Sequence, residues 1–177
     1  MIEIKKSETA DTRTCDFAKV SEETLKKSSE THIDDVSRGL AFFGALLAEA
    51  AVTHDSDKLS ALAHFHSDFV TGFKTTGWWD NHRKITRHHL QAADGVPPDV
   101  NLIDVLEMIV DCVMAGMARA GKTYPVTIHG DVLSRAFDNT VELLQSQVVV
   151  APNNGREVRR DAVTSTGLLA VSGSGDK

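Results

Sequence analysis

Residues 33–55, with the sequence IDDVSRGLAFFGALLAEAAVTHD, decide the fold of this chain. Their apolar side chains recur at steps of three and four residues, at Ile33, Val36, Leu40, Phe43, Leu47 and Ala50. This spacing is typical of one face of an amphipathic helix, so we expect a helix that ends between Val52 and Asp55. The backbone turns at such an end, and His54 and Asp55 can then both reach one ion. Inside a regular helix, adjacent side chains point about 100° apart.

Four further helices are predicted after this one, because apolar residues recur at the same steps between loops rich in glycine and proline. We expect a helix from Ser56 or Asp57 to about Val70, one that carries His82, Ile85 and His89, one from Asp99 or Asn101 to Gly121, and one from Asp131 to Gln147. The chain is therefore predicted to be an all-α bundle of about five main helices. Residues 31–150 would form it, after a polar N-terminal arm (1–30) with at most one short helix, and before a mostly irregular tail (151–177).

Composition excludes several classes of function. The formal net charge is −6, which argues against a broad basic surface for duplex nucleic acid. No apolar run reaches the roughly 20 residues of a membrane span, and the N-terminus lacks a signal-peptide pattern, so we expect a cytoplasmic protein without a membrane partner. Cys15 and Cys112 lie far apart without a CxxC spacing, so a disulfide framework and a thiolate zinc site are not predicted.

The histidines are unevenly distributed. Seven of the eight lie between residues 32 and 89, namely His32, His54, His64, His66, His82, His88 and His89. Imidazoles with carboxylates are ligands suited to Mn, Fe, Co, Ni or Zn, so the pattern predicts a site for one or two divalent ions. His64 and His66 alternate with Phe65 and are predicted to be helix-surface or packing residues rather than ligands, while Trp78 and Trp79 are predicted to be core anchors.

The fourth predicted helix carries three acidic residues at steps of three and four, Asp104, Glu107 and Asp111, which share one side of it. This stripe lies opposite the apolar face. It can be a solvated surface, or it can face a pocket and supply ligands. The residues themselves leave both interpretations open.

The order His32, His54-Asp55, Lys58, His82, His88-His89 and Asp111 resembles the HD-domain metallophosphohydrolase superfamily. HDSDK (54–58) is similar to the HDxxK form of its cyclic-di-GMP phosphodiesterase branch, although the Gly-Tyr-Pro turn of that branch is incomplete here. The segments HDSDK, WDNH, HHLQ and EMIVD also resemble short, poorly characterised, mostly phage-encoded HD-like proteins. This likeness covers about residues 32–119 and implies an HD-like helical domain, in host cytoplasm if the chain is phage-encoded.

The resemblance implies a role for each of these residues. His32, His54, Asp55 and Asp111 would hold one ion, and His82, His88 and His89 would hold a second ion or bind phosphate. Lys58, with Arg83 and Arg87 as weaker candidates, would bind substrate phosphate, and Asp55 and Lys58 would take part in catalysis. Glu107 and Asp104 would orient the ligating side chains by contacting them on the side away from the ion.

The expected function is metal-dependent hydrolysis of a phosphoester in a nucleotide, as in a 5'-nucleotidase or a deoxynucleotide hydrolase. A divalent ion lowers the pKa of its water toward about 7 and so supplies the nucleophile. Three alternatives stay open: hydrolysis of a cyclic or linear dinucleotide, nucleotide binding without turnover, and a structural protein whose histidines are incidental. Exposed apolar faces of the predicted helices also suggest a homodimer.

Overall fold

The computed structural model describes residues 1–6 and 12–151 and is mostly helical, which confirms an all-α fold of about five helices. The helices are α1 (Glu22–Thr53), α2 (Ser56–Ser60), α3 (Leu62–Phe69), α4 (Trp78–Ile85), α5 (Leu102–Ala120) and α6 (Gly130–Gln147), with 3-10 turns η1 (Thr12–Thr14) and η2 (Ala93–Gly95) and strands β1 (Ile2–Lys5) and β2 (Val148–Ala151). Most of the predicted tail, residues 152–177, lies outside the described residues.

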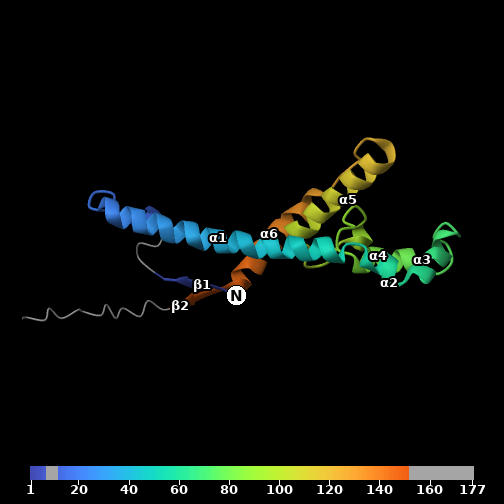
Figure 1. The fold of residues 1–177 in the computed structure, drawn as a ribbon, viewed down its shortest axis with the longest axis horizontal. Coiled ribbons are helices and arrows are strands. Elements are labelled where there is room, and N and C mark those ends of the chain that lie inside the picture. The colour runs from blue at the N-terminus through green and yellow to red at the C-terminus, as the bar shows by residue number, and fades with distance from the viewer. Residues whose placement is uncertain (7–11, 152–177) are drawn as a thin grey trace, which may run out of the picture.

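Helix α1 is the longest helix and lies along the long axis of the molecule, and α2, α3 and α4 lie near its C-terminal end (Figure 1). It begins at Glu22 rather than near Ile33, because Ser21 caps it by accepting a hydrogen bond from the Thr24 N–H, and two acidic residues stabilise its first turn. Helix α1 therefore passes through residue 30, where the sequence predicts the boundary between the polar arm and the helical domain. Helix α1 ends at Thr53, as the apolar spacing predicts.

The second and third predicted helices are both interrupted. The second is broken at Ala61 into α2 and α3. The third ends at Ile85, so His88 and His89 lie in the turn that follows α4 and not on a helix. The second break leaves His88 near the end of α1, where its ring centroid lies 4.5 Å from that of His54.

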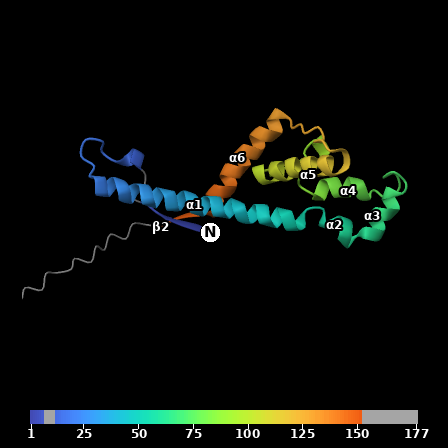
Figure 2. The same ribbon diagram turned by 45° about the horizontal axis from the view of Figure 1, so that its top comes forward.

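Helices α5 and α6 have the predicted bounds to within one residue. Asn101 and Asp104 form a capping box at the start of α5, and Gly121 ends the helix with a positive φ of 65°. Helices α5 and α6 contact each other, and α6 runs away from α1 at an angle (Figure 2). Helix α5 also contacts α1, which brings its acidic side close to His54.

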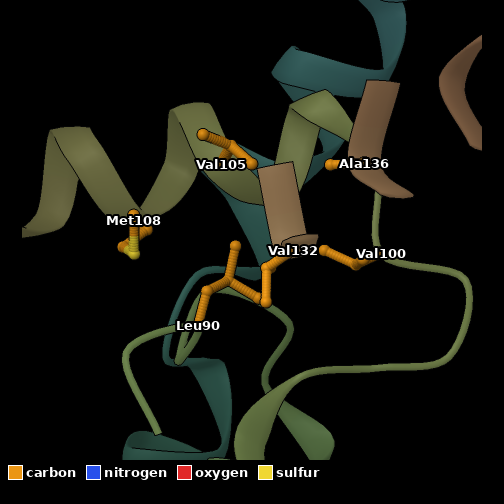
Figure 3. Packing of buried hydrophobic residues seen from close by; sticks show 6 residues of the cluster. All are labelled: Leu90, Val100, Val105, Met108, Val132 and Ala136. Atoms are coloured by element: carbon orange, nitrogen blue, oxygen red, sulfur yellow. The ribbon is translucent and has the colours of Figure 1, made fainter. Parts of the chain in front are cut away.

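The hydrophobic core is small and lies between α5, α6 and the loop before α5 (Figure 3). Its buried members are Leu90, Val100, Val105, Met108, Val132 and Ala136. Leu90 is 1% exposed and directly follows His89 in the sequence. Burial of Leu90 therefore fixes the turn that carries His88 and His89.

Strands β1 and β2 form a two-stranded parallel ribbon, with Ile2 opposite Val148, that joins the N-terminus to the end of α6. The sequence did not predict it, because each strand has only four residues. By length and composition alone, the helical stretch Glu22–Ser60 could cross a membrane. That is weak evidence, since core helices pass the same test, and this stretch ends in the polar contacts of His54, Asp55 and Lys58.

Candidate metal centre

The turn between α1 and α2 presents His54 and Asp55 together. His54 is the C-cap of α1, and Asp55 adopts a left-handed backbone with φ of 52°, a conformation that aspartate tolerates better than most residues. As a result His54 Nε2 lies 3.5 Å from Asp55 Oδ2. Lys58, one turn further along, pairs with the same carboxylate oxygen. The other oxygen, Oδ1, is buried and has no hydrogen-bond partner.

Helix α4 carries His82 into the same place. Asp68, which is fully buried, anchors the start of α4 by accepting hydrogen bonds from the backbone N–H groups of Thr75, Thr76 and Trp79. The backbone bonds, that of Thr76 above all, outweigh desolvation and lower the pKa of Asp68. Gly77, the N-cap residue, has no side chain to do this, so a distant carboxylate replaces the usual cap.

The His82 imidazole is fully buried and held on two sides. It stacks on the Trp78 ring with centroids 4.8 Å apart and planes 14° apart. Its Nδ1 lies 2.8 Å from Asp57 Oδ2, a contact in which the imidazole N–H donates to the carboxylate. In the neutral tautomer with its proton on Nδ1, Nε2 can bind an ion, and it lies 3.3 Å from Asp55 Oδ1.

The turn after α4 brings His88 and His89 to the same point. Gly95 packs so closely under this turn that a Cβ there would lie 2.3 Å from the His89 carbonyl oxygen. His88 Nε2 lies 3.6 Å from Asp55 Oδ1. Glu107 of α5 stands behind, with Oε1 2.9 Å from His54 Nδ1 and 3.0 Å from His88 Nδ1.

Four side chains therefore converge. Asp55, His82, His88 and His89 each offer one ligand atom, and these atoms lie within 4.8 Å of one another. Asp55 Oδ1 and the three Nε2 atoms are buried without a hydrogen-bond partner, which is costly unless something binds them. Ligands about 2.0–2.1 Å from a tetrahedral ion are about 3.3–3.4 Å apart, close to the 3.3 and 3.6 Å measured from Asp55 to His82 and His88.

The protonation states also suit a cation. Burial, helped by His88 and His82, lowers the pKa of His89 to about 4, so this imidazole is neutral at pH 7. Burial alone would raise the pKa of Asp55 and Glu107, but the Lys58 ion pair lowers that of Asp55, and hydrogen bonds from His88 and His54 lower that of Glu107. Both carboxylates are thus ionised.

Cavities adjoin the cluster on three sides. One of about 210 Å³ is lined by Arg83, His88, His89 and Asp111. A second of about 500 Å³ is an acidic groove bounded by α1, α5 and Arg87. A third, of about 340 Å³, is an apolar groove between α1 and α5 with His54 at one end.

The predicted phosphate-binding cations are already paired with carboxylates. Arg83 donates to Asp80 and Asp94, and its pKa is raised by these hydrogen bonds. Arg87 makes a two-pronged contact with Asp104 through Nε and Nη2, and its pKa is raised as well. Lys58 is the cation closest to the cluster.

Three predicted site residues lie elsewhere than expected. His32 and His54 belong to the same continuous helix, and 22 residues (54 − 32) at 1.5 Å each separate them by about 33 Å, so His32 cannot bind the same ion. Asp104 does not face the histidines but binds Arg87 and caps α5. Asp111 stays near the site, with Oδ1 3.8 Å from His54 Nε2, outside the group of four.

The acidic stripe of α5 is not a solvated surface. Asp104 is 3% exposed, and the Glu107 side chain is 16% exposed between two histidines. The residue that sequence reasoning missed is Asp57, which orients His82. In the sequence, only its position within HDSDK points to a role for Asp57. Its contact with His82 is not visible there, because His82 lies 25 positions further along.

No family model, curated protein or solved structure matches this chain. The site's chemistry therefore has to be argued from the residues themselves.

Proposed function

We propose that Asp55, His82, His88 and His89 hold a divalent transition metal and that the protein is a metal-dependent phosphohydrolase acting on a nucleotide. One observation carries the proposal: four buried ligand atoms converge with no hydrogen-bond partner among the described residues. Three imidazoles and one carboxylate suit Mn, Fe, Co, Ni or Zn. An incidental group of buried histidines would be expected to satisfy these atoms.

The residues behind the ligands support the same conclusion. Asp57 holds His82 with Nε2 toward the cluster, and Glu107 lies against the Nδ1 atoms of His54 and His88. Carboxylates on the far side of ligating imidazoles fix the tautomer and raise the basicity of the ligand. In the sequence, Asp57 and Glu107 lie far from the histidines that they contact, so their positions depend on the folded chain.

The chain's own residues also suit a hydrolase. When bound, a divalent ion supplies a water of lowered pKa and polarises a phosphoryl oxygen. Lys58 adds positive charge beside Asp55, where it can help to bind a phosphate. His54 and Asp111, 3.8 Å apart, lie within reach of the same place and can accept or hold a proton.

The test uses full-length protein without a histidine tag, loaded with Mn²⁺, and a panel of nucleoside mono-, di- and triphosphates and dinucleotides. We expect metal-dependent release of phosphate or of a monophosphate, and its loss in His88→Gln. The matched control is His64→Gln, because His64 is exposed on α3. Metal binding without turnover of any compound would contradict the enzyme, and nucleotide binding by that inactive protein, measured by calorimetry, would identify a binding protein instead.

A further inference from the structure

We propose that the apolar groove between α1 and α5 holds the planar, uncharged part of the substrate, and that a nucleotide base lies there without being identified by its hydrogen-bonding edge. This inference rests on the proposed function and names the substrate class of that site. The groove measures about 340 Å³ and is lined by Leu47, Ala50 and Ala51 of α1 and by Leu106, Val110 and Met114 of α5.

The groove adjoins the metal centre at His54, whose ring centroid lies 4.5 Å from that of His88, although none of the four proposed ligands lines the groove itself. His54, Glu107 and Asp111 line one end of it, and His54 Nε2 lies 3.5 Å from a carboxylate oxygen of Asp55. A molecule bound at the ligand cluster by its phosphate can therefore extend past His54 into the groove.

Charge decides which part of the substrate enters. The polar end of the groove carries the carboxylates of Glu107 and Asp111, and none of the residues that line it is a lysine or arginine. A phosphate would be repelled there, whereas Lys58 stands at the cluster. The phosphate thus belongs at the cluster and the uncharged part in the groove.

The walls decide the chemistry of that part. Val110 and Met114 are 58% and 64% exposed, so their apolar surface gains from being covered by a flat, weakly polar ring. The groove offers few groups to read a base edge, because His54, Glu107 and Asp111 are the only polar side chains among the described residues that line it, His54 Nδ1 is already engaged with Glu107, and the rest of the lining is apolar. Bases of different kinds should therefore bind with similar strength.

The experiment compares substrates that carry the same kind of phosphate ester, on the 5-hydroxyl of a pentose, and differ in the base or lack it. With Mn²⁺-loaded full-length protein, kcat/KM is measured for the four common nucleoside 5'-monophosphates and for ribose 5-phosphate. We expect each nucleotide to exceed ribose 5-phosphate by about 10-fold or more, which corresponds to about 1.4 kcal/mol, and the four bases to agree within about 5-fold.

Variants locate the effect. Val110→Ser combined with Met114→Gln should reduce the ratio of nucleotide to ribose 5-phosphate below about 3-fold. Both residues are exposed, so the variant should fold, and near-wild-type melting is checked first. Met117→Gln is the matched control, because Met117 is an equally exposed methionine of α5 outside the groove, and it should keep the full ratio.

The outcomes separate the two proposals. Hydrolysis of ribose 5-phosphate as fast as of the nucleotides would overturn the groove assignment and leave the phosphohydrolase standing. Hydrolysis of none of these compounds or of the wider panel would overturn the proposed function and this inference with it. If the double variant keeps the ratio but is a monomer in solution where the wild type is a dimer, the groove is an interface between two copies of the chain. The assignment of a base site to the groove is then wrong.

Discussion

The two ends of α1 are built differently. At the C-terminal end, His54 is engaged with Glu107, and Asp55 with Lys58. Further from that end, the apolar residues that predicted the helix are largely uncovered, with Ile33 63% and Leu40 66% exposed. Apolar periodicity therefore predicts a helix correctly without saying what covers its face. The polar end is positioned by specific pairs, and these are what make a site.

The largest effect should come from removing a ligand at the polar end. Metal at 100 times its Kd should stabilise the protein by about 2.7 kcal/mol, which is roughly 5–10 °C in Tm for a chain of this size. We expect His88→Gln to lose this metal-induced shift entirely, as followed by thermal melting with and without Mn²⁺ or Ni²⁺. His32→Gln should keep this shift, since His32 lies about 33 Å away along the helix. If His32→Gln loses the shift, His32 is a metal ligand, as the family resemblance implied.

Close packing of Gly95 against the backbone of His89 holds the turn that carries the ligands His88 and His89. Gly95→Ala would place a Cβ 2.3 Å from the His89 carbonyl oxygen, so we expect a destabilisation of about 1–3 kcal/mol and a smaller metal-induced shift. Gly44→Ala is the matched control, because nothing lies within 4 Å of its added Cβ in the middle of α1. There alanine should stabilise by about 0.5–1 kcal/mol in urea unfolding. Equal effects at both sites would contradict the tight turn.

The lowered pKa of His89 predicts a pH dependence for the metal-free protein. Between pH 6.5 and about 4 the unfolded chain binds a proton at His89 that the folded chain does not, so stability falls as pH is lowered through this window and is flat above it. After allowance for partial solvent screening, we expect a loss of about 1–2 kcal/mol. His89→Gln should flatten this part of the profile in urea titrations from pH 7 to 4. An unchanged slope would show that His89 is not buried as described.

The exposed face of α1 should be the least sensitive to mutation within one chain. Leu40→Gln should change the unfolding free energy by no more than about 0.5 kcal/mol at micromolar protein, because Leu40 is mostly solvent-exposed. The homodimer predicted from the sequence would cover such a face. If the unfolding free energy falls by more than about 2 kcal/mol, and by more at higher protein concentration, Leu40 lies in that interface. The contrast between the two ends of α1 would then be wrong.

Local signals explain what the sequence predicts well. Helix α5 has an asparagine cap, an apolar period and a terminal glycine, all within its own segment. The pairing of β1 with β2 joins the two ends of the described chain, and each strand is too short to show a pattern. Long-range pairing of this kind leaves no local trace.

The site follows the same rule. His54 and Asp55 were found because they end a helix, and His82, His88 and His89 because they cluster in the sequence. His32 was assigned to the site by the family resemblance, although the single helix predicted between His32 and His54 already places these two histidines at its opposite ends. Asp57 was missed because only the folded loop reveals that it faces His82.

The most direct test of the metal centre is the metal content of full-length protein purified without a histidine tag and dialysed against a buffer that contains Mn²⁺, Fe²⁺, Co²⁺, Ni²⁺ or Zn²⁺ in turn. We predict that at least one of these metals is retained at about one ion per chain in the wild type and in His32→Gln. Almost none should remain in His88→Gln or in a variant that combines His54→Ala with Asp55→Ala. Retention of the metal by both of these site variants, or its absence from the wild type, would contradict the account.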